Sequence, residues 1–152
     1  MPKTIISDTS CLIVLTNIGE LDLLRKVYGT IVTTVDIAME FGEPLPDWII
    51  IEKVADKYRQ QLLEMQIDKG ESSAIALALE TSDSTVILDD YRARKIAEQL
   101  GVNYTGTIGV IIKAKINGAI PSIKSILAKI KETDFRLSAD IERQALLAAG
   151  EI

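Results

Sequence analysis

Short apolar runs alternate along this chain with longer segments whose apolar residues recur at helical spacing. The clearest short runs are residues 4–7 and 85–88, and each is followed by a helical pattern. This alternation is typical of β-α-β units, in which parallel strands are buried between helices. The chain has 152 residues and contains no internal repeat or linker, so we expect a single α/β domain with a mainly parallel sheet.

Turn residues and apolar spacing predict where the other elements lie. Pro44 and Pro46 make residues 42–46 a loop, because two prolines this close prevent a helix or strand from continuing. Further strands are expected at 30–33, 48–51 (as an edge) and 102–104. Helices are expected at about 10–26 with an interruption near Gly19, and at 35–41, 55–66, 71–80 and 91–100, from 107 onward, at 122–132 and at 138–149.

The absence of histidine limits the chemistry that this chain can perform. With no His and a single cysteine, Cys11, the chain excludes His general bases, His zinc sites, disulfides and CxxC motifs. We interpret Cys11 as a core residue. Catalysis would have to use carboxylates, hydroxyls, lysines or the backbone.

Charge is unevenly distributed. The net charge is −5, yet residues 104–131 contain no acid and five lysines. The N-terminus shows no signal-peptide pattern, and no uncharged apolar stretch approaches the length of a membrane span. We therefore expect a cytoplasmic protein that does not enter the membrane.

Carboxylates follow both of the clearest predicted strands. Asp8 comes directly after the first run, and the pair Asp89-Asp90 follows the run 85–88. In an open parallel sheet, ligands bind at the carboxyl ends of the strands, so these acids should face one crevice. Glu40, late in a predicted helix, and Glu71, at the start of another, are further candidates.

Each of these acids also has a purely structural interpretation. Asp8, Asp89 and Asp90 could cap helices, and the spacing from residue 68 to Glu71 resembles a capping box. Glu40 could lie on a solvated face. Asp90 is also spaced for a helical ion pair with Arg94.

Taken together, the acids indicate a metal site. Several carboxylates in one crevice repel each other unless a cation is present. Oxygen ligands without His or Cys favour Mg²⁺ or Mn²⁺, and such a site is suited to phosphodiester hydrolysis. A dehalogenase-type phosphatase is disfavoured because Ser10 stands where that family needs an aspartate, and no P-loop is present.

The order of these segments resembles the PIN-domain family. The similarity comprises Ser7-Asp8-Thr9-Ser10, Glu40, Asp68-Lys69-Gly70-Glu71, Asp89-Asp90 with Arg94, and Gly106-Thr107-Ile108-Gly109. It is closest to a prokaryotic, VapC-like, toxin-related branch with D-x-G-E and DD-x-x-x-R segments. It covers residues 5 to about 120, whereas the helices at about 122–152 are less diagnostic.

The resemblance implies a three-layer α-β-α sandwich around a Rossmann-like sheet and a Mg²⁺- or Mn²⁺-dependent ribonuclease. It implies catalytic roles for Asp8, Glu40, Glu71 and Asp90, with the metal held by Asp8, Glu40, Asp89 and Asp90. Which member of Asp89-Asp90 faces the metal stays open. Supporting roles follow for Ser10, Thr107 and Arg94, and we expect Arg94 to orient a carboxylate.

We therefore expect a metal-dependent endoribonuclease, and the toxin of a toxin–antitoxin pair is a role that this resemblance suggests. Its partners would be RNA, a small antitoxin protein and a second copy of the chain, the dimer using apolar helix faces such as Leu21, Leu23 and Leu24. Lys113 and Lys115, from the acid-free segment, would contact RNA phosphates. The alternatives are a non-catalytic PIN-like nucleic-acid-binding or regulatory module, and a metal phosphatase on a similar sheet.

Overall fold

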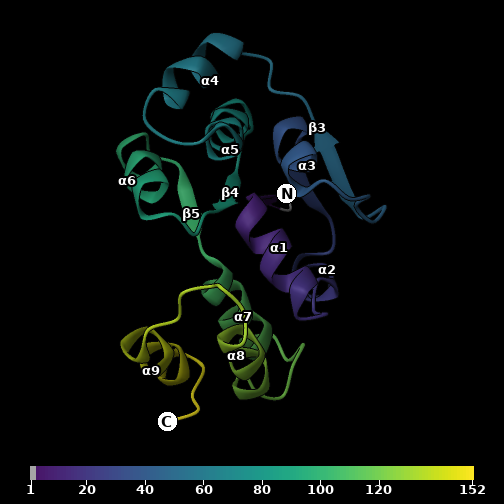
Figure 1. Cartoon of the computed structure of the whole chain (residues 1–152), viewed down its shortest axis with the longest axis vertical. Coiled ribbons are helices and arrows are strands. Elements are labelled where there is room, and N and C mark those ends of the chain that lie inside the picture. Colours follow the sequence, from purple (N-terminus) through teal and green to yellow (C-terminus); the bar gives the residue numbers. More distant parts are fainter. Residues whose placement is uncertain (1–2) are drawn as a thin grey trace.

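The sheet is the centre of the computed structural model, which describes residues 3–152 (Figure 1). Its five strands lie in the order β3-β2-β1-β4-β5, and every neighbouring pair is parallel. The strands are β1 (Thr4–Ser7), β2 (Ile31–Thr34), β3 (Ile49–Glu52), β4 (Ser84–Ile87) and β5 (Asn103–Thr105). This confirms the predicted α/β fold with a parallel sheet.

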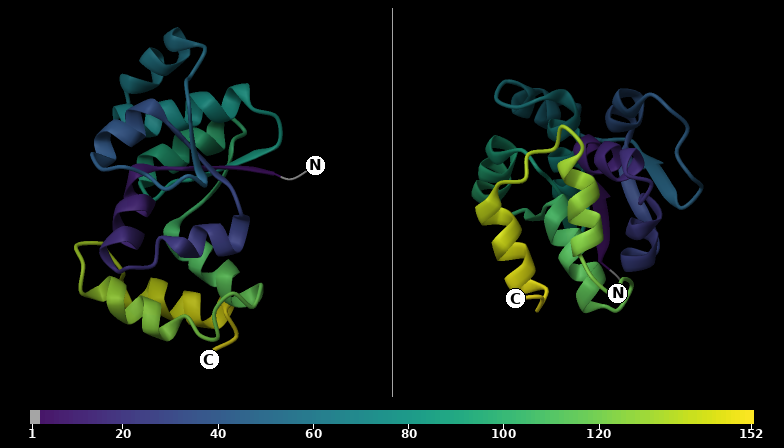
Figure 2. Two further views of the ribbon diagram at one scale, coloured as in Figure 1. Left: turned by 90° about the vertical axis from the view of Figure 1, so that its right-hand side faces the viewer. Right: turned by 60° about the horizontal axis from the view of Figure 1, so that its bottom comes forward.

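Helices cover both faces of this sheet. They are α1 (Thr9–Asn17), α2 (Asp22–Tyr28), α3 (Val35–Phe41), α4 (Lys57–Glu64), α5 (Lys69–Glu80), α6 (Tyr91–Gln99), α7 (Thr107–Ile116), α8 (Lys124–Lys131) and α9 (Ala139–Ala148). Figure 2 shows α3 to α6 on one side of the sheet and α1, α2 and α7 to α9 on the other. The expected α-β-α sandwich is therefore confirmed. Within residues 3–152, no helix combines the length and apolar character needed to cross a membrane.

The element boundaries differ slightly from prediction: β2, β3 and β5 begin one residue later than expected and β4 one residue earlier. The helical pattern after Asp8 is interrupted near Gly19, as predicted: it forms two helices, and Gly19 adopts a positive φ of 73° just after the first one. Helix α5 begins at Lys69, before the expected start at Glu71, which places Gly70 inside its first turn. Strand β3 is an edge strand, as predicted.

The two central strands carry the core. Ile6 of β1 and Val86 and Ile87 of β4 are fully buried, as is Ile75 of α5. Helix α5 is buried along most of its length, from Ser72 to Ala78. This packing fixes the carboxyl ends of β1 and β4, where the order of the strands reverses.

Candidate active site

Asp8 ties the ends of the two central strands together. It caps α1, with Oδ1 accepting a hydrogen bond from the Cys11 amide at 2.9 Å. Its other oxygen, Oδ2, accepts from the Asp89 amide at 3.0 Å. The side chain of Cys11 is fully buried, which confirms its predicted place in the core. Asp8 itself is only 2% exposed. It caps a helix and also lines the cavity, so its two interpretations from the sequence are both correct.

Asp89 is held beside Asp8 by two hydroxyls and an amide. Its Oδ1 accepts from the Thr107 amide at 2.8 Å, and its Oδ2 accepts from Ser10 Oγ at 2.9 Å and Thr107 Oγ1 at 2.6 Å. Asp90, in contrast, caps α6 by accepting from the Ala93 amide at 2.9 Å, and it is exposed. Of the acidic pair, Asp89 is therefore the partner of Asp8.

Two carboxylates in this region, those of Asp8 and Glu71, resist ionisation. The pKa of Asp8 is raised well above its ordinary value, first by burial and then by the negative charge of Asp89. The pKa of Glu71 is raised to about 7, mainly by burial and further by Asp90 and Asp68. Ionising Asp8 and Glu71 in the folded protein therefore costs free energy when no cation is bound.

These acids line two adjoining cavities. The first, of about 400 Å³, is lined by Asp8, Thr9, Ser10, Ile13, Glu40, Asp68 and Glu71. The second, of about 350 Å³, is lined by Ser10, Glu71, Asp89, Asp90, Phe135 and Arg136. Ser10 and Glu71 belong to both walls, so carboxylates from four predicted segments do meet at one edge of the sheet.

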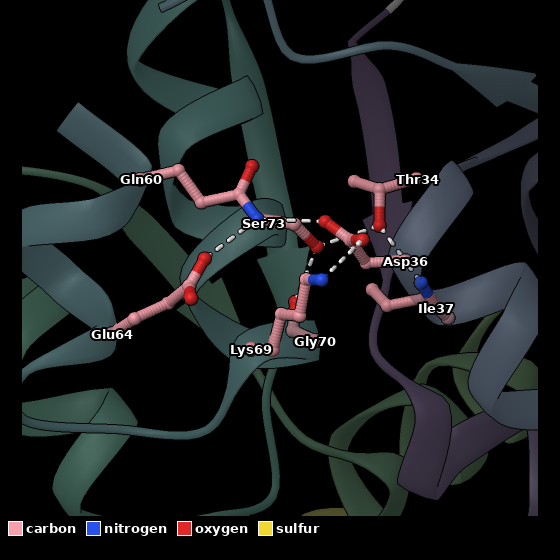
Figure 3. A network of polar contacts seen from close by, with 8 residues as sticks. All are labelled: Thr34, Asp36, Ile37, Gln60, Glu64, Lys69, Gly70 and Ser73. Carbon is pink, nitrogen blue, oxygen red and sulfur yellow. Dashed lines mark hydrogen bonds and ion pairs between the residues drawn. The ribbon is translucent and has the colours of Figure 1, made fainter. Parts of the chain in front are cut away.

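A polar network sets the distance between the helices that carry Glu40 and Glu71 (Figure 3). Thr34 Oγ1 and Ser73 Oγ lie 2.6 Å apart, and Ser73 also donates to the Gly70 carbonyl at 2.6 Å. Gln60 donates to Asp36 at 2.6 Å, which joins α4 to α3.

Gly70 brings the backbone of α5 close to Glu40. A Cβ at this position would lie 3.0 Å from Glu40 Oε1 and 3.3 Å from Thr9 Oγ1. A side chain at Gly70 would therefore require Glu40 or Thr9 to shift by a few tenths of an ångström at the cavity wall.

The donor set fits a hard divalent cation. All candidate ligands are oxygens, neighbouring carboxylates add to burial in raising the pKa values of Asp8 and Glu71, and the buried Thr9 Oγ1 has no hydrogen-bond partner among the described residues. In residues 3–152, however, no three acidic side chains are already grouped closely enough to hold one ion. A bound ion would therefore have to draw further ligands toward the Asp8–Asp89 pair.

Arg94 does not form the ion pair with Asp90 that its spacing suggested. No such pair exists in the described part of the chain. Instead, Arg94 Nε donates to the Leu88 carbonyl at 2.6 Å, and the guanidinium lies 5.6 Å from the Tyr104 ring centre. Arg94 thus holds the backbone just before Asp89 in place, and it does not orient a carboxylate through an ion pair.

The two candidate RNA-binding lysines have partners within the chain. Lys115 Nζ lies 3.2 Å from a carboxylate oxygen of Glu151, and Lys113 Nζ lies 5.0 Å from the Tyr28 ring centre. Neither residue lines the two acidic cavities. Their contact with RNA stays a prediction.

Five residues at the two acidic cavities were not predicted as site residues: Thr9, Ile13, Asp68, Phe135 and Arg136. Asp68 could have been, since it begins the D-x-G-E segment. Phe135 and Arg136 come from the segment between α8 and α9, where no motif marks them. Their position depends on how two C-terminal helices pack, which a local pattern does not show.

Comparison with known proteins identifies the family. A search of curated proteins and of solved structures returns no match to this chain. A family model described as PIN domain matches residues 4–151. The match includes the C-terminal helices, which the sequence motifs left less well defined. Since it spans nearly all of the sequence, the chain belongs to the PIN-domain family.

Proposed function

We propose that this chain is a divalent-metal-dependent endoribonuclease. The observation that carries the proposal is the pairing of buried Asp8 with half-buried Asp89 at the carboxyl ends of β1 and β4, with Glu71 in a neighbouring wall. Membership of a nuclease-type family supports the same activity.

The roles of the residues follow from their contacts. Asp8 and Asp89 would hold Mg²⁺ or Mn²⁺, with Glu40, Glu71 and Asp90 completing the acidic wall. The ion would neutralise charge at an RNA phosphate and acidify a water molecule. Ser10 and Thr107 hold the Asp89 carboxylate in place through hydrogen bonds at 2.9 and 2.6 Å.

A non-catalytic module is the second candidate. It is favoured by the lack of a ready-made group of three acidic ligands in residues 3–152. Such a module would bind RNA and release no product with Mn²⁺. A metal phosphatase, the third possibility, would hydrolyse a generic phosphomonoester.

The test is cleavage of a fluorescent single-stranded RNA by the full chain with Mn²⁺, with Mg²⁺ or with EDTA. We expect products only with a divalent ion, and a loss of at least about 100-fold in Asp8→Asn and Asp89→Asn, since a metal supplies several kcal/mol of charge stabilisation. Asp47→Asn, an exposed carboxylate outside the cavities, is the matched control. Equal cleavage by all three variants would indicate a contaminating nuclease and refute the proposal.

The biological role that we propose is the toxin of a toxin–antitoxin pair. An antitoxin segment bearing Arg or Lys would enter the acidic cavities and pair with their carboxylates. Co-purification from the native host with mass spectrometry tests this partner, and recovery of the free chain alone would refute it.

A homodimer is a separate proposal about the assembly of this chain. Leu23 and Leu24 are 2% and 0% exposed within the chain's own core and Leu21 is half-buried against it, so of the dimer face suggested from the sequence only Leu21 is partly accessible. A dimer would need another surface. Light scattering of the purified chain measures its mass, and a monomer mass at all concentrations would contradict the proposal.

A further inference from the structure

A third cavity lies directly behind Asp89. It has a volume of about 420 Å³, within the range of small-molecule sites, and its wall includes Asp89, Arg94, Tyr104, Gly106, Phe135 and Arg136. It therefore combines two guanidinium groups and two aromatic rings with the carboxylate that we assign to the metal site. Neither Phe135 nor Arg136 has a role in the function proposed above.

Arg136 belongs to the wall of this cavity and to that of the second acidic cavity, as Asp89 does. It lines both, together with Phe135, because the segment between α8 and α9 passes the start of α7 (Figures 1 and 2). Arg136 is exposed, and within residues 3–152 it makes no ion pair even though Glu71, Asp89 and Asp90 line the same cavity. Its charge is thus free for an anionic ligand.

Arg94 differs from Arg136 because contacts within the chain hold its guanidinium in place. The Leu88 carbonyl and the Tyr104 ring hold its guanidinium, and its Nη2 occupies the space beside Gly106. A Cβ on Gly106 would overlap that nitrogen and lie 3.1 Å from Asp89 Oδ1. Gly106 therefore allows an arginine to stand close to the carboxylate.

We propose that this third cavity is the subsite for the nucleotide next to the scissile phosphate of single-stranded RNA. Arg136, with Arg94, binds the flanking phosphate, and the base stacks on the aromatic wall formed by Phe135 and Tyr104. Guanidinium groups match phosphate oxygens in geometry and charge, and aromatic rings accept any base by its face. The proposal rests on the RNA-directed function proposed above and names how that site holds its substrate.

Binding is measured separately from cleavage, so that the two proposals can fail independently. The probe is a fluorescein-labelled single-stranded RNA octamer, titrated by anisotropy into the Asp8→Asn chain across a salt series. In this background we expect Arg136→Ala to weaken binding about 10-fold and to reduce the slope of log K against log salt by about 0.7, as for one lost phosphate contact. Arg143→Ala, an exposed arginine of α9 outside the cavity, removes the same charge and should change little.

The aromatic wall is tested with Phe135→Leu, which keeps the apolar packing of this half-buried residue. We expect RNA binding to weaken about 5-fold or more, since stacking contributes about 1–3 kcal/mol per base. Inorganic polyphosphate, which has no base, should bind this variant normally and bind Arg136→Ala less tightly.

Several results would overturn the subsite. They are equal effects of Arg136→Ala and Arg143→Ala, an unchanged affinity in Phe135→Leu, or no RNA binding by the Asp8→Asn chain. If the binding effects appear but the unsubstituted chain cleaves nothing with Mn²⁺, the subsite stands and the nuclease proposal fails.

Discussion

Glu71→Gln should stabilise the metal-free protein, although it alters the candidate active site. Burial and the charges of Asp90 and Asp68 raise the pKa of Glu71 from 4.5 to about 7. Below pH 4.5 the carboxyl is protonated in both the folded and the unfolded chain, so ionisation does not affect folding. Between pH 4.5 and about 7 the unfolded chain ionises this group while the folded protein keeps it protonated, so stability falls across this interval and stays low above it, a loss that a neutral amide would avoid.

The pKa shift sets the size of the effect. A rise from 4.5 to about 7 corresponds to about 3 kcal/mol, and the partial exposure of the group reduces this to about 1–3 kcal/mol. For a chain of this length, such a gain raises the melting temperature by roughly 2–10 °C at pH 8. At pH 4 the gain should vanish.

The assay is thermal unfolding followed by circular dichroism, in EDTA, from pH 4 to pH 8. Glu43→Gln, an exposed glutamate in the loop after α3, is the matched control and should leave the curve unchanged. A melting temperature of Glu71→Gln that stays below that of the unsubstituted chain at pH 8 would refute the reasoning, as would a gain that does not depend on pH.

Four further outcomes are expected. Saturating Mn²⁺ should stabilise the chain by about 2.7 kcal/mol at 100 times its Kd, and Asp8→Asn should abolish the shift; a melting temperature unmoved by millimolar Mn²⁺ would contradict a metal site. Gly70→Ala should weaken Mn²⁺ binding without lowering metal-free stability, because its Cβ would lie 3.0 Å from Glu40 Oε1; calorimetric titration measures this, and unchanged affinity would exclude Glu40 as a ligand. Hydrogen bonds from Ser122 and the Ile123 amide lower the pKa of Glu151 to about 2. The stability lost in Glu151→Gln at pH 7 should therefore shrink as pH falls below 4.5, and a difference in melting temperature that does not change with pH would refute this prediction. Lys113→Ala should reduce the salt slope of RNA binding by about 0.7 if the lysine contacts a phosphate; an unchanged slope would end that prediction.

The sequence predicted the fold well because its signals were local. Four-residue apolar strands followed by aspartate fixed both the strand positions and the edge at which Asp8 and Asp89 meet. Parallel strands end at the same edge whatever the loops do, so convergence of these acids did not depend on any detail of packing.

Side-chain partners were harder to predict because each group has several within reach. Arg94 could bond a carboxylate or a carbonyl, and the structure selects the Leu88 carbonyl. Asp89 and Asp90 are adjacent and chemically alike, yet only Asp89 meets the hydroxyls of Ser10 and Thr107. Arg136 reaches the site through the packing of two helices far along the chain, which periodicity does not encode.

The pairing of β1 with β4 also determines when the acidic site can assemble during synthesis. Asp8 Oδ2 accepts a hydrogen bond from the amide of Asp89, a residue 81 positions later. Ribosomes add about 5–20 residues each second, so the first strand waits several seconds for its central partner. Until then the apolar residues of β1, which are buried in the folded protein, stay exposed, and the acidic site has not assembled. A chain with nuclease activity would thus be inert while it is being made, and an interacting protein present during synthesis could meet it before the two aspartates are joined.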